Sequence, residues 1–201
     1  DQGWDVLVPD PRGSTGHGRD YQQALRGGWG RMDVDDAAAV VAAGHQRGWS
    51  SPALTVMIGS SSGGLTALGV LGLHPGLACG GVVLHPVTDL AALAEFSHRF
   101  EAHYTDTLVG PPGDERYRSH SPLAYADRID VPLLVMHGDA DPVVPIESTL
   151  AFVDRMRAAG GDVELVVMAG EGHGFRDPAN RRADYELTAA FLRRVASQPS
   201  G

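Results

Sequence analysis

The 201-residue sequence has little cysteine and little positive charge. Cys79 is its single cysteine, which excludes an internal disulfide and a metal centre built from cysteines. It has no repeat, no low-complexity tract and no apolar run of membrane-spanning length, so no membrane partner is expected. The 16 Lys and Arg residues face 25 Asp and Glu residues, and the formal net charge is -9. No nucleic-acid partner is expected either, because phosphate binding needs a basic face.

The remaining composition is that of an ordinary globular protein, with 43% hydrophobic and 20% charged residues. We expect residues 1–201 to form a single domain, because this length suits one chain with a core of its own. The first residue is Asp rather than Met, so export stays open beside the default expectation of a cytoplasmic location. Association into a homo-oligomer also stays open.

Short apolar runs alternate with segments of helical periodicity. The runs are nearly continuous, as strands buried on both faces require, and they lie at 4–10, 54–59, 79–87, 131–138 and 163–170. The helical segments lie at 33–47, 63–73, 147–159 and 181–196. This order predicts an α/β fold with a mainly parallel sheet and helices on both faces. Residues 96–128 interrupt it, and we expect a long excursion with short helices over the sheet edge.

Three consecutive serines at 60–62 connect a predicted strand to a predicted helix. A nucleophilic serine at the apex of a sharp strand-to-helix turn needs small residues two positions before and after it. Gly59 and Gly63 hold these positions around Ser61, whereas the β-branched Ile58 stands two before the first serine. The G-x-S-x-G pattern therefore selects Ser61. A plain Ser/Gly turn that caps a helix is the alternative, and these five residues alone do not separate the two.

A serine nucleophile needs a base and an acid that orients the base, in the chain order Ser, acid, His on this kind of fold. Asp139 and Asp141 follow one predicted strand, and His173 lies in a glycine-rich loop after the last. Because catalytic groups in open α/β sheets gather at the carboxyl ends of strands, these positions suit a triad. We favour Asp141 as the acid. Asp139 is the alternative acid, although a local turn-capping role would suit it.

Five stretches of the chain resemble the catalytic domain of the prolyl oligopeptidase family of serine peptidases, which includes dipeptidyl peptidases and acylaminoacyl peptidases. They are PDPRGSTGHGRDY (9–21), GGWGRMDVDD (27–36), GSSSGG (59–64), SPLAYADRIDVPLLVMHGDADPVVP (121–145) and GEGHGF (170–175). The first two are much more specific than G-x-S-x-G, which many α/β hydrolases share. The resemblance covers nearly the whole chain and implies an α/β-hydrolase fold that hydrolyses peptide substrates without a metal or organic cofactor.

The resemblance places the family's nucleophile on Ser61, its acid on Asp141 and its base on His173. It also makes the backbone N–H of Ser62 one oxyanion donor, at a position that is aromatic or Ala in many members. In the family, a strand and a His-Gly-Gly-type or Tyr-bearing loop before the PRGS segment supply the other oxyanion contact, and nothing equivalent precedes Trp4. The resemblance thus implies a fold without its first strands, in the C-terminal catalytic part of a longer chain with an N-terminal propeller-like domain.

Other residues are weaker candidates. Arg12 and Arg19 could bind a substrate carboxylate, but structural ion pairs are the favoured interpretation. His85 and Asp89 follow a predicted strand and could approach the site, but a structural role is the favoured interpretation for both. Aromatic side chains of the excursion could line an acyl or proline pocket, and plain packing is an equal alternative for Phe96, Phe100, Tyr104 and Tyr117.

Two other functions stay open. A carboxylesterase or a dienelactone-hydrolase-like enzyme would use the same triad on a small substrate, although the segments at 9–21 and 27–36 argue against it. A non-catalytic α/β module, used for dimerisation or left by a broken gene, is the alternative from a different class. The intact set of Ser61, Asp141 and His173 argues against that module.

Overall fold

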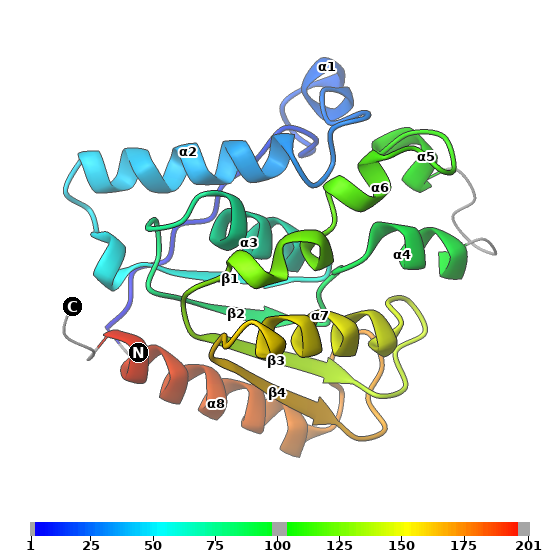
Figure 1. Ribbon diagram of the computed structural model, residues 1–201. Coiled ribbons are helices and arrows are strands. Elements are labelled where there is room, and N and C mark those ends of the chain that lie inside the picture. The colour runs from blue at the N-terminus through cyan, green and yellow to red at the C-terminus, as the bar shows by residue number, and fades with distance from the viewer. Residues whose placement is uncertain (1–2, 98–103, 197–201) are drawn as a thin grey trace.

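A four-stranded sheet forms the centre of the fold (Figure 1). The computed structural model describes residues 3–97 and 104–196. All neighbouring strands are parallel, in the spatial order β1, β2, β3, β4. Their bounds are Val56–Ser60 for β1, Gly80–Leu84 for β2, Leu133–Gly138 for β3 and Val163–Met168 for β4. Each strand overlaps one apolar run of the sequence, so the predicted parallel α/β architecture is confirmed.

The four predicted helices are also present, with bounds shifted by a few residues. They are α2 (Met32–Gln46), α3 (Ser62–Leu73), α7 (Ile146–Ala158) and α8 (Pro178–Ala196). Shorter elements are α1 (Arg19–Gln23), α4 (Leu90–Ser97), α5 (Tyr104–Leu108), α6 (Arg116–Ser119) and the 3₁₀ segments η1 (Pro52–Leu54) and η2 (Pro122–Arg128). None of the helices in the described ranges is long and apolar enough to cross a bilayer.

The segment at 4–10 was predicted as a strand, and that prediction is wrong. Residues 4–10 are not a strand, and within the described part of the chain their backbone joins no sheet. Val6 and Val8 are 83% and 79% exposed, so the segment also lacks an apolar face to pack against. Its β-forming side chains do not suffice, because a strand is stabilised by ladder hydrogen bonds and cross-strand packing rather than by intrinsic propensity.

The core lies on both faces of the sheet, because successive side chains of a strand point in opposite directions. Val82 of β2 and Met136 of β3 pack with Phe191 and Val195 of α8. Alternate residues of the same two strands pack instead with α3 and α7, in a cluster that contains Val83, Leu133, Val135, Leu68, Leu71, Phe152 and Met156. Figure 1 shows α3 and α8 on opposite sides of the sheet. Helices therefore cover both faces, as predicted, and they fix the strand ends in place.

The turn from β1 into α3 is strained at Ser61, which has φ of +54° and ψ of -120°. Positive φ is uncommon for a residue with a side chain and persists only where the surroundings hold it. Here the Ser61 N–H donates to the Leu84 carbonyl at 3.0 Å, and the Ser61 carbonyl accepts from Gly64 N at 3.0 Å and Leu65 N at 3.2 Å. These bonds to β2 and α3 hold the hydroxyl-bearing residue at the apex.

The glycines around this apex are not equivalent. A Cβ on Gly59 would lie 2.1 Å from the carbonyl oxygen of Gly63, so only glycine fits there. A Cβ on Gly63 would meet nothing within 4 Å, whereas one on Gly64 would lie 2.8 Å from the Cβ of Pro86. The expectation of a small residue is thus confirmed at Gly59. At Gly63 the space is open to a methyl group, so glycine itself is not required there. The tight position after the apex is Gly64.

Gly59→Ala is expected to lower the free energy of unfolding by about 3 kcal/mol or more, because the new methyl group collides with backbone atoms. Gly63→Ala is the matched control. It is expected to raise the free energy of unfolding by about 0.5 to 1 kcal/mol, since alanine is the better helix former and the space is open. Urea unfolding of both variants checks this, and equal stabilities would contradict the turn geometry.

Candidate active site

Ser61, Asp141 and His173 lie in the segments that follow three strands of the sheet. Ser61 directly follows β1, Asp141 lies in the loop after β3, and His173 lies in the loop after β4. Because the strands are parallel, these loops emerge at the same edge of the sheet. The structure therefore brings together three residues that lie far apart in the sequence.

A continuous chain of hydrogen bonds joins the three side chains. His173 Nε2 is 3.0 Å from Ser61 Oγ, and His173 Nδ1 is 2.8 Å from Asp141 Oδ2. A carboxylate can only accept, so the hydrogen-bonding network assigns the proton of the neutral imidazole to Nδ1. Nε2 is then left to accept from the Ser61 hydroxyl.

The carboxylate of Asp141 is fully buried and accepts hydrogen bonds on both oxygens. Oδ1 accepts from Val143 N at 2.8 Å and Val144 N at 3.0 Å, and Oδ2 accepts from His173. Burial by itself raises the pKa of a carboxyl group. At Asp141 that effect is outweighed by hydrogen bonds from His137, His173 and the two backbone N–H groups, which hold its pKa well below the usual range. Asp141 is therefore ionised at every pH near neutrality.

His137, the penultimate residue of β3, supports the same carboxylate. Its side chain is completely buried, with Nε2 3.3 Å from Asp141 Oδ2 and 3.2 Å from the Val144 carbonyl. Both neighbours are acceptors, so Nε2 carries the proton, and Nδ1 accepts from the Thr149 hydroxyl at 2.9 Å. Sequence analysis missed this role. The available signal was a histidine inside an otherwise apolar strand, since a buried polar side chain needs partners.

Asp139 has a different position. Its Oδ1 accepts from Gly170 N at 2.6 Å, which links the loop after β3 to the loop after β4. The bond joins two loops that lie far apart in the sequence, so it differs from the local turn cap that the sequence suggested for Asp139. The two loops also approach closely at Gly138, where a Cβ would lie 2.2 Å from the carbonyl oxygen of Glu171.

A buried glutamate, Glu171, shapes the loop that carries His173, and sequence analysis missed it. Its carboxylate accepts from Arg176 N and Asp177 N at 2.8 Å each, and from Asn180 Nδ2 at 2.9 Å. The bond from Arg176 N is the largest cause that holds the pKa of Glu171 below its usual range. Glu171 thereby connects the loop to the first turn of α8, and a lone acid among glycines gives no sequence signal for this role.

Ser62 is the first residue of α3, directly after Ser61. The first N–H groups of a helix have no acceptor within the helix, so the Ser62 N–H is available to an oxygen beside Ser61. No group of three or more His, Cys, Asp or Glu side chains in the described ranges is arranged to hold a metal ion.

Three of the weaker candidates have structural contacts. Arg12 forms an ion pair with Asp36 at 2.7 Å, as favoured from the sequence. Asp89 caps α4, where its Oδ1 accepts from Ala91 N at 2.9 Å. His85 lies against the ring of His173, with the two ring centroids 4.3 Å apart.

The aromatic candidates of the excursion differ in their surroundings. Tyr117 is buried and its hydroxyl donates to the Gly110 carbonyl at 3.0 Å, so it packs inside the protein. Tyr104 makes an edge contact with Trp29, and Phe96 is about half-exposed. Phe100 lies outside the described residues.

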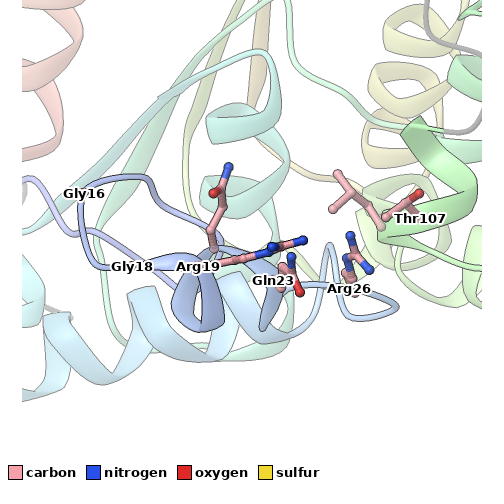
Figure 2. A pocket seen from close by; sticks show the side chains of 8 residues that line it. Gly16, Gly18, Arg19, Gln23, Arg26 and Thr107 are labelled. Carbon is pink, nitrogen blue, oxygen red and sulfur yellow. The ribbon is translucent and has the colours of Figure 1, made fainter.

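A cavity of about 590 Å³ lies between α1 and α5, and none of the three hydrogen-bonded residues lines it (Figure 2). Its walls are formed by Gly16, Gly18, Arg19, Gln22, Gln23, Arg26, Thr107 and Leu108. Figure 2 shows the Arg19 and Arg26 side chains at this cavity. A carboxylate-binding role for Arg19 stays a prediction, and it has no contact with Ser61, Asp141 or His173 to support it.

Comparisons with known proteins extend over nearly the whole chain. Residues 1–198 match the profile of the Prolyl oligopeptidase family. The chain is 32% identical over 199 residues to dipeptidyl aminopeptidase BIII of Pseudoxanthomonas mexicana, covering 95% of this chain and 29% of that protein. It is 28% identical over 196 residues to the acylamino-acid-releasing enzyme of Arabidopsis thaliana, covering 92% of this chain and 25% of the enzyme.

Solved structures also resemble this fold over nearly the whole chain. A puromycin-hydrolyzing peptidase of Mycobacterium tuberculosis superposes with a TM-score of 0.89 at 34% identity, covering 96% of this chain and 30% of that one. The chain thus spans less than a third of the length of the relatives it matches. Since the family profile and a relative above 30% identity both match almost end to end, the chain belongs to the prolyl oligopeptidase family.

Proposed function

We propose that this chain is the catalytic part of a serine peptidase that cleaves peptide bonds of short peptides. One observation carries the proposal: the unbroken hydrogen-bond chain from Ser61 through His173 to Asp141, at the edge where three strands end. Membership of the family supports it, because the relatives named above include a dipeptidyl aminopeptidase and an acylamino-acid-releasing enzyme. The strained apex at Ser61 supports it further, since backbone strain clusters at functional sites.

The geometry suits acyl transfer in two steps. Ser61 Oγ attacks the substrate carbonyl carbon while His173 Nε2 takes the hydroxyl proton, and the proton then passes to the leaving amine as the amide C–N bond breaks. An ester bond now joins the acyl group to Ser61. Water attacks this ester, His173 takes a proton from the water, and the proton returns to Ser61 Oγ as the acid product leaves.

Asp141 makes His173 an effective base in this scheme. The ionised carboxylate keeps the proton of the neutral imidazole on Nδ1, so that Nε2 is free to accept. It also stabilises the imidazolium that forms when Nε2 takes the Ser61 proton. Because hydrogen bonds already satisfy both carboxylate oxygens, Asp141 need not reorganise during the reaction.

The Ser62 N–H is our candidate for one oxyanion donor, at the N-terminal end of the twelve-residue helix α3. The positive end of the helix dipole favours the negative charge that develops on the carbonyl oxygen. We infer that a second donor comes from a part of the longer protein outside residues 1–201, since the relatives are more than three times as long. Loss of one such donor costs roughly 10²- to 10³-fold in rate, so the experiments below use the full-length protein.

A fluorophosphonate probe is expected to label Ser61 in the full-length protein, because the hydrogen bond to His173 activates that hydroxyl. Peptide mapping by mass spectrometry locates the label, and Ser61→Ala should abolish it. Labelling that survives Ser61→Ala, or a label found wholly on Ser62 in the unmutated protein, would show that the nucleophile is misassigned.

Asp141→Asn is expected to lower kcat by about 10⁴-fold, since an amide can stabilise the wrong tautomer of His173. Asp139→Asn is the matched control. Its carboxylate bonds to Gly170 N rather than to His173, so kcat should stay within about tenfold of the unmutated value. Steady-state kinetics on one peptide substrate measure both, and a larger loss in Asp139→Asn than in Asp141→Asn would reverse the assignment of the acid.

The rate of hydrolysis of a peptide amide should rise with pH between about pH 5 and 8, the range in which a histidine base loses its proton. Asp141 does not contribute to this rise, because its lowered pKa keeps it ionised throughout. A profile of kcat/KM against pH measures the effect.

A flat profile over that range would contradict His173 as the base.

An enzyme that cleaves short esters and leaves every peptide amide uncut would instead be a pure esterase.

A further inference from the structure

A second serine–histidine pair lies beside the first. Ser60 Oγ is 2.8 Å from His85 Nε2, and Ser60 directly precedes Ser61 in the turn. This pair cannot repeat the chemistry of Ser61 and His173. The Nδ1 of His85 is buried and has no hydrogen-bond partner in the described part of the chain, so no acid bonds to the ring and orients it. The pair therefore needs another explanation.

The ring of His85 is neutral at ordinary pH. Burial is the main cause that lowers the pKa of His85 to about 4, and the neighbouring His173 lowers it further. His137 acts in the same direction, and only the Asp141 carboxylate acts against it. A cationic His85 would also bury an N–H without an acceptor, which is costly. Between pH 5 and 8, a neutral ring thus faces the imidazole of His173.

The backbone of His85 is strained, as it is at Ser61. His85 directly follows β2, and its φ is +36°, a region that residues with side chains rarely adopt. Its N–H donates to the Met136 carbonyl at 2.7 Å, which ties the strained residue to β3. Ser61 and His85 are the two non-glycine residues with positive φ in the described chain, and their strained backbones place two neighbouring side chains.

The ring of His85 packs against the ring of His173 on one side and against Phe175 and His137 on others. It meets His173 at a centroid distance of 4.3 Å with a tilt of 56°. Phe175 and His137 contact it edge-on, with centroids at 6.1 Å and 6.4 Å. The bond to Asp141 fixes one edge of the His173 ring, and the close contact with the His85 ring restrains rotation about that bond.

We propose that His85 is a positioning residue, whose neutral ring, anchored by the Ser60 hydroxyl, holds His173 with Nε2 directed at Ser61 Oγ. The inference rests on the proposed function, because it assigns His85 to the same reaction. A neutral partner suits the task, since it does not repel the imidazolium that His173 becomes during catalysis. Ser60 thereby has a role of its own, without acting as a nucleophile.

Three variants of the full-length protein separate the ring contact from its anchor. His85→Ala removes both, and kcat is expected to fall about 10- to 100-fold with KM nearly unchanged, because small misplacements of a base are costly. His85→Phe keeps a ring without the bond to Ser60, and Ser60→Ala removes the bond while leaving the ring. For His85→Phe and Ser60→Ala, kcat is expected to fall only about two- to tenfold, which corresponds to the loss of one hydrogen bond.

The matched control is His45→Ala. His45 Nε2 bonds to the Thr55 hydroxyl at 2.9 Å, the same kind of contact, just before the opposite end of β1. Its kcat and its rate of fluorophosphonate labelling should equal those of the unmutated protein. A loss of kcat in His45→Ala as large as in His85→Ala would show a general effect of removing a histidine, and would overturn the proposal.

The outcomes distinguish this inference from the proposed function. An unmutated protein that is not labelled at Ser61 overturns both. If the unmutated protein is labelled, unchanged kcat and labelling rate in folded His85→Ala overturn the role of His85 alone. A loss in His85→Phe as large as in His85→Ala overturns the ring contact. If His85→Ala fails to fold, the kcat of Ser60→Ala is the test. An unchanged kcat in Ser60→Ala would then overturn the proposal.

Discussion

One buried carboxylate, that of Asp141, organises the candidate active site. A buried charge is costly unless it is paired and hydrogen-bonded. Asp141 meets that condition with backbone N–H groups on one oxygen and two imidazoles near the other. Its own loop, the buried strand β3 and the loop after β4 are therefore held in one arrangement. Removal of any of these donors would leave the buried carboxylate with fewer hydrogen bonds. The stability of the fold and the placement of His173 are therefore coupled.

The parallel sheet explains how such distant residues meet. Core packing on both faces fixes β2 and β3, and the loops that leave the strand ends carry the polar groups. The strained residues Ser61 and His85 lie at two neighbouring strand ends, and each makes a backbone hydrogen bond across to the next strand. The rigid sheet thus stabilises local conformations that would be unfavourable in an isolated turn.

Much of this arrangement could be predicted from the sequence, because it follows local patterns. Nearly continuous apolar runs identified β1 to β4, and G-x-S-x-G selected Ser61 over its neighbours. The segment at 4–10 shows where such patterns fail: its apolar residues suit a strand, but within the described chain it joins no sheet. Propensity cannot reveal whether a pairing partner is present.

The supporting residues could not be predicted, because their roles depend on tertiary contacts. His137 and Glu171 belong to segments read as a strand and a glycine-rich loop, and nothing nearby in the sequence indicates their partners. A structural role was favoured for His85, and only the fold shows its ring packed against that of His173. Gly63 illustrates the reverse case, since the motif has glycine at a position where the packing leaves room for a methyl group.

The central claim is that Asp141 sets the proton positions of the two histidines that it contacts. Nitrogen-15 NMR of histidine side chains in the full-length protein, above the pH at which imidazoles are protonated, tests it most directly. We predict opposite tautomers, with the proton on Nδ1 of His173 and on Nε2 of His137, because each ring presents that nitrogen to the carboxylate. A His173 that carries its proton on Nε2 would contradict the account, since it could not accept the proton of Ser61.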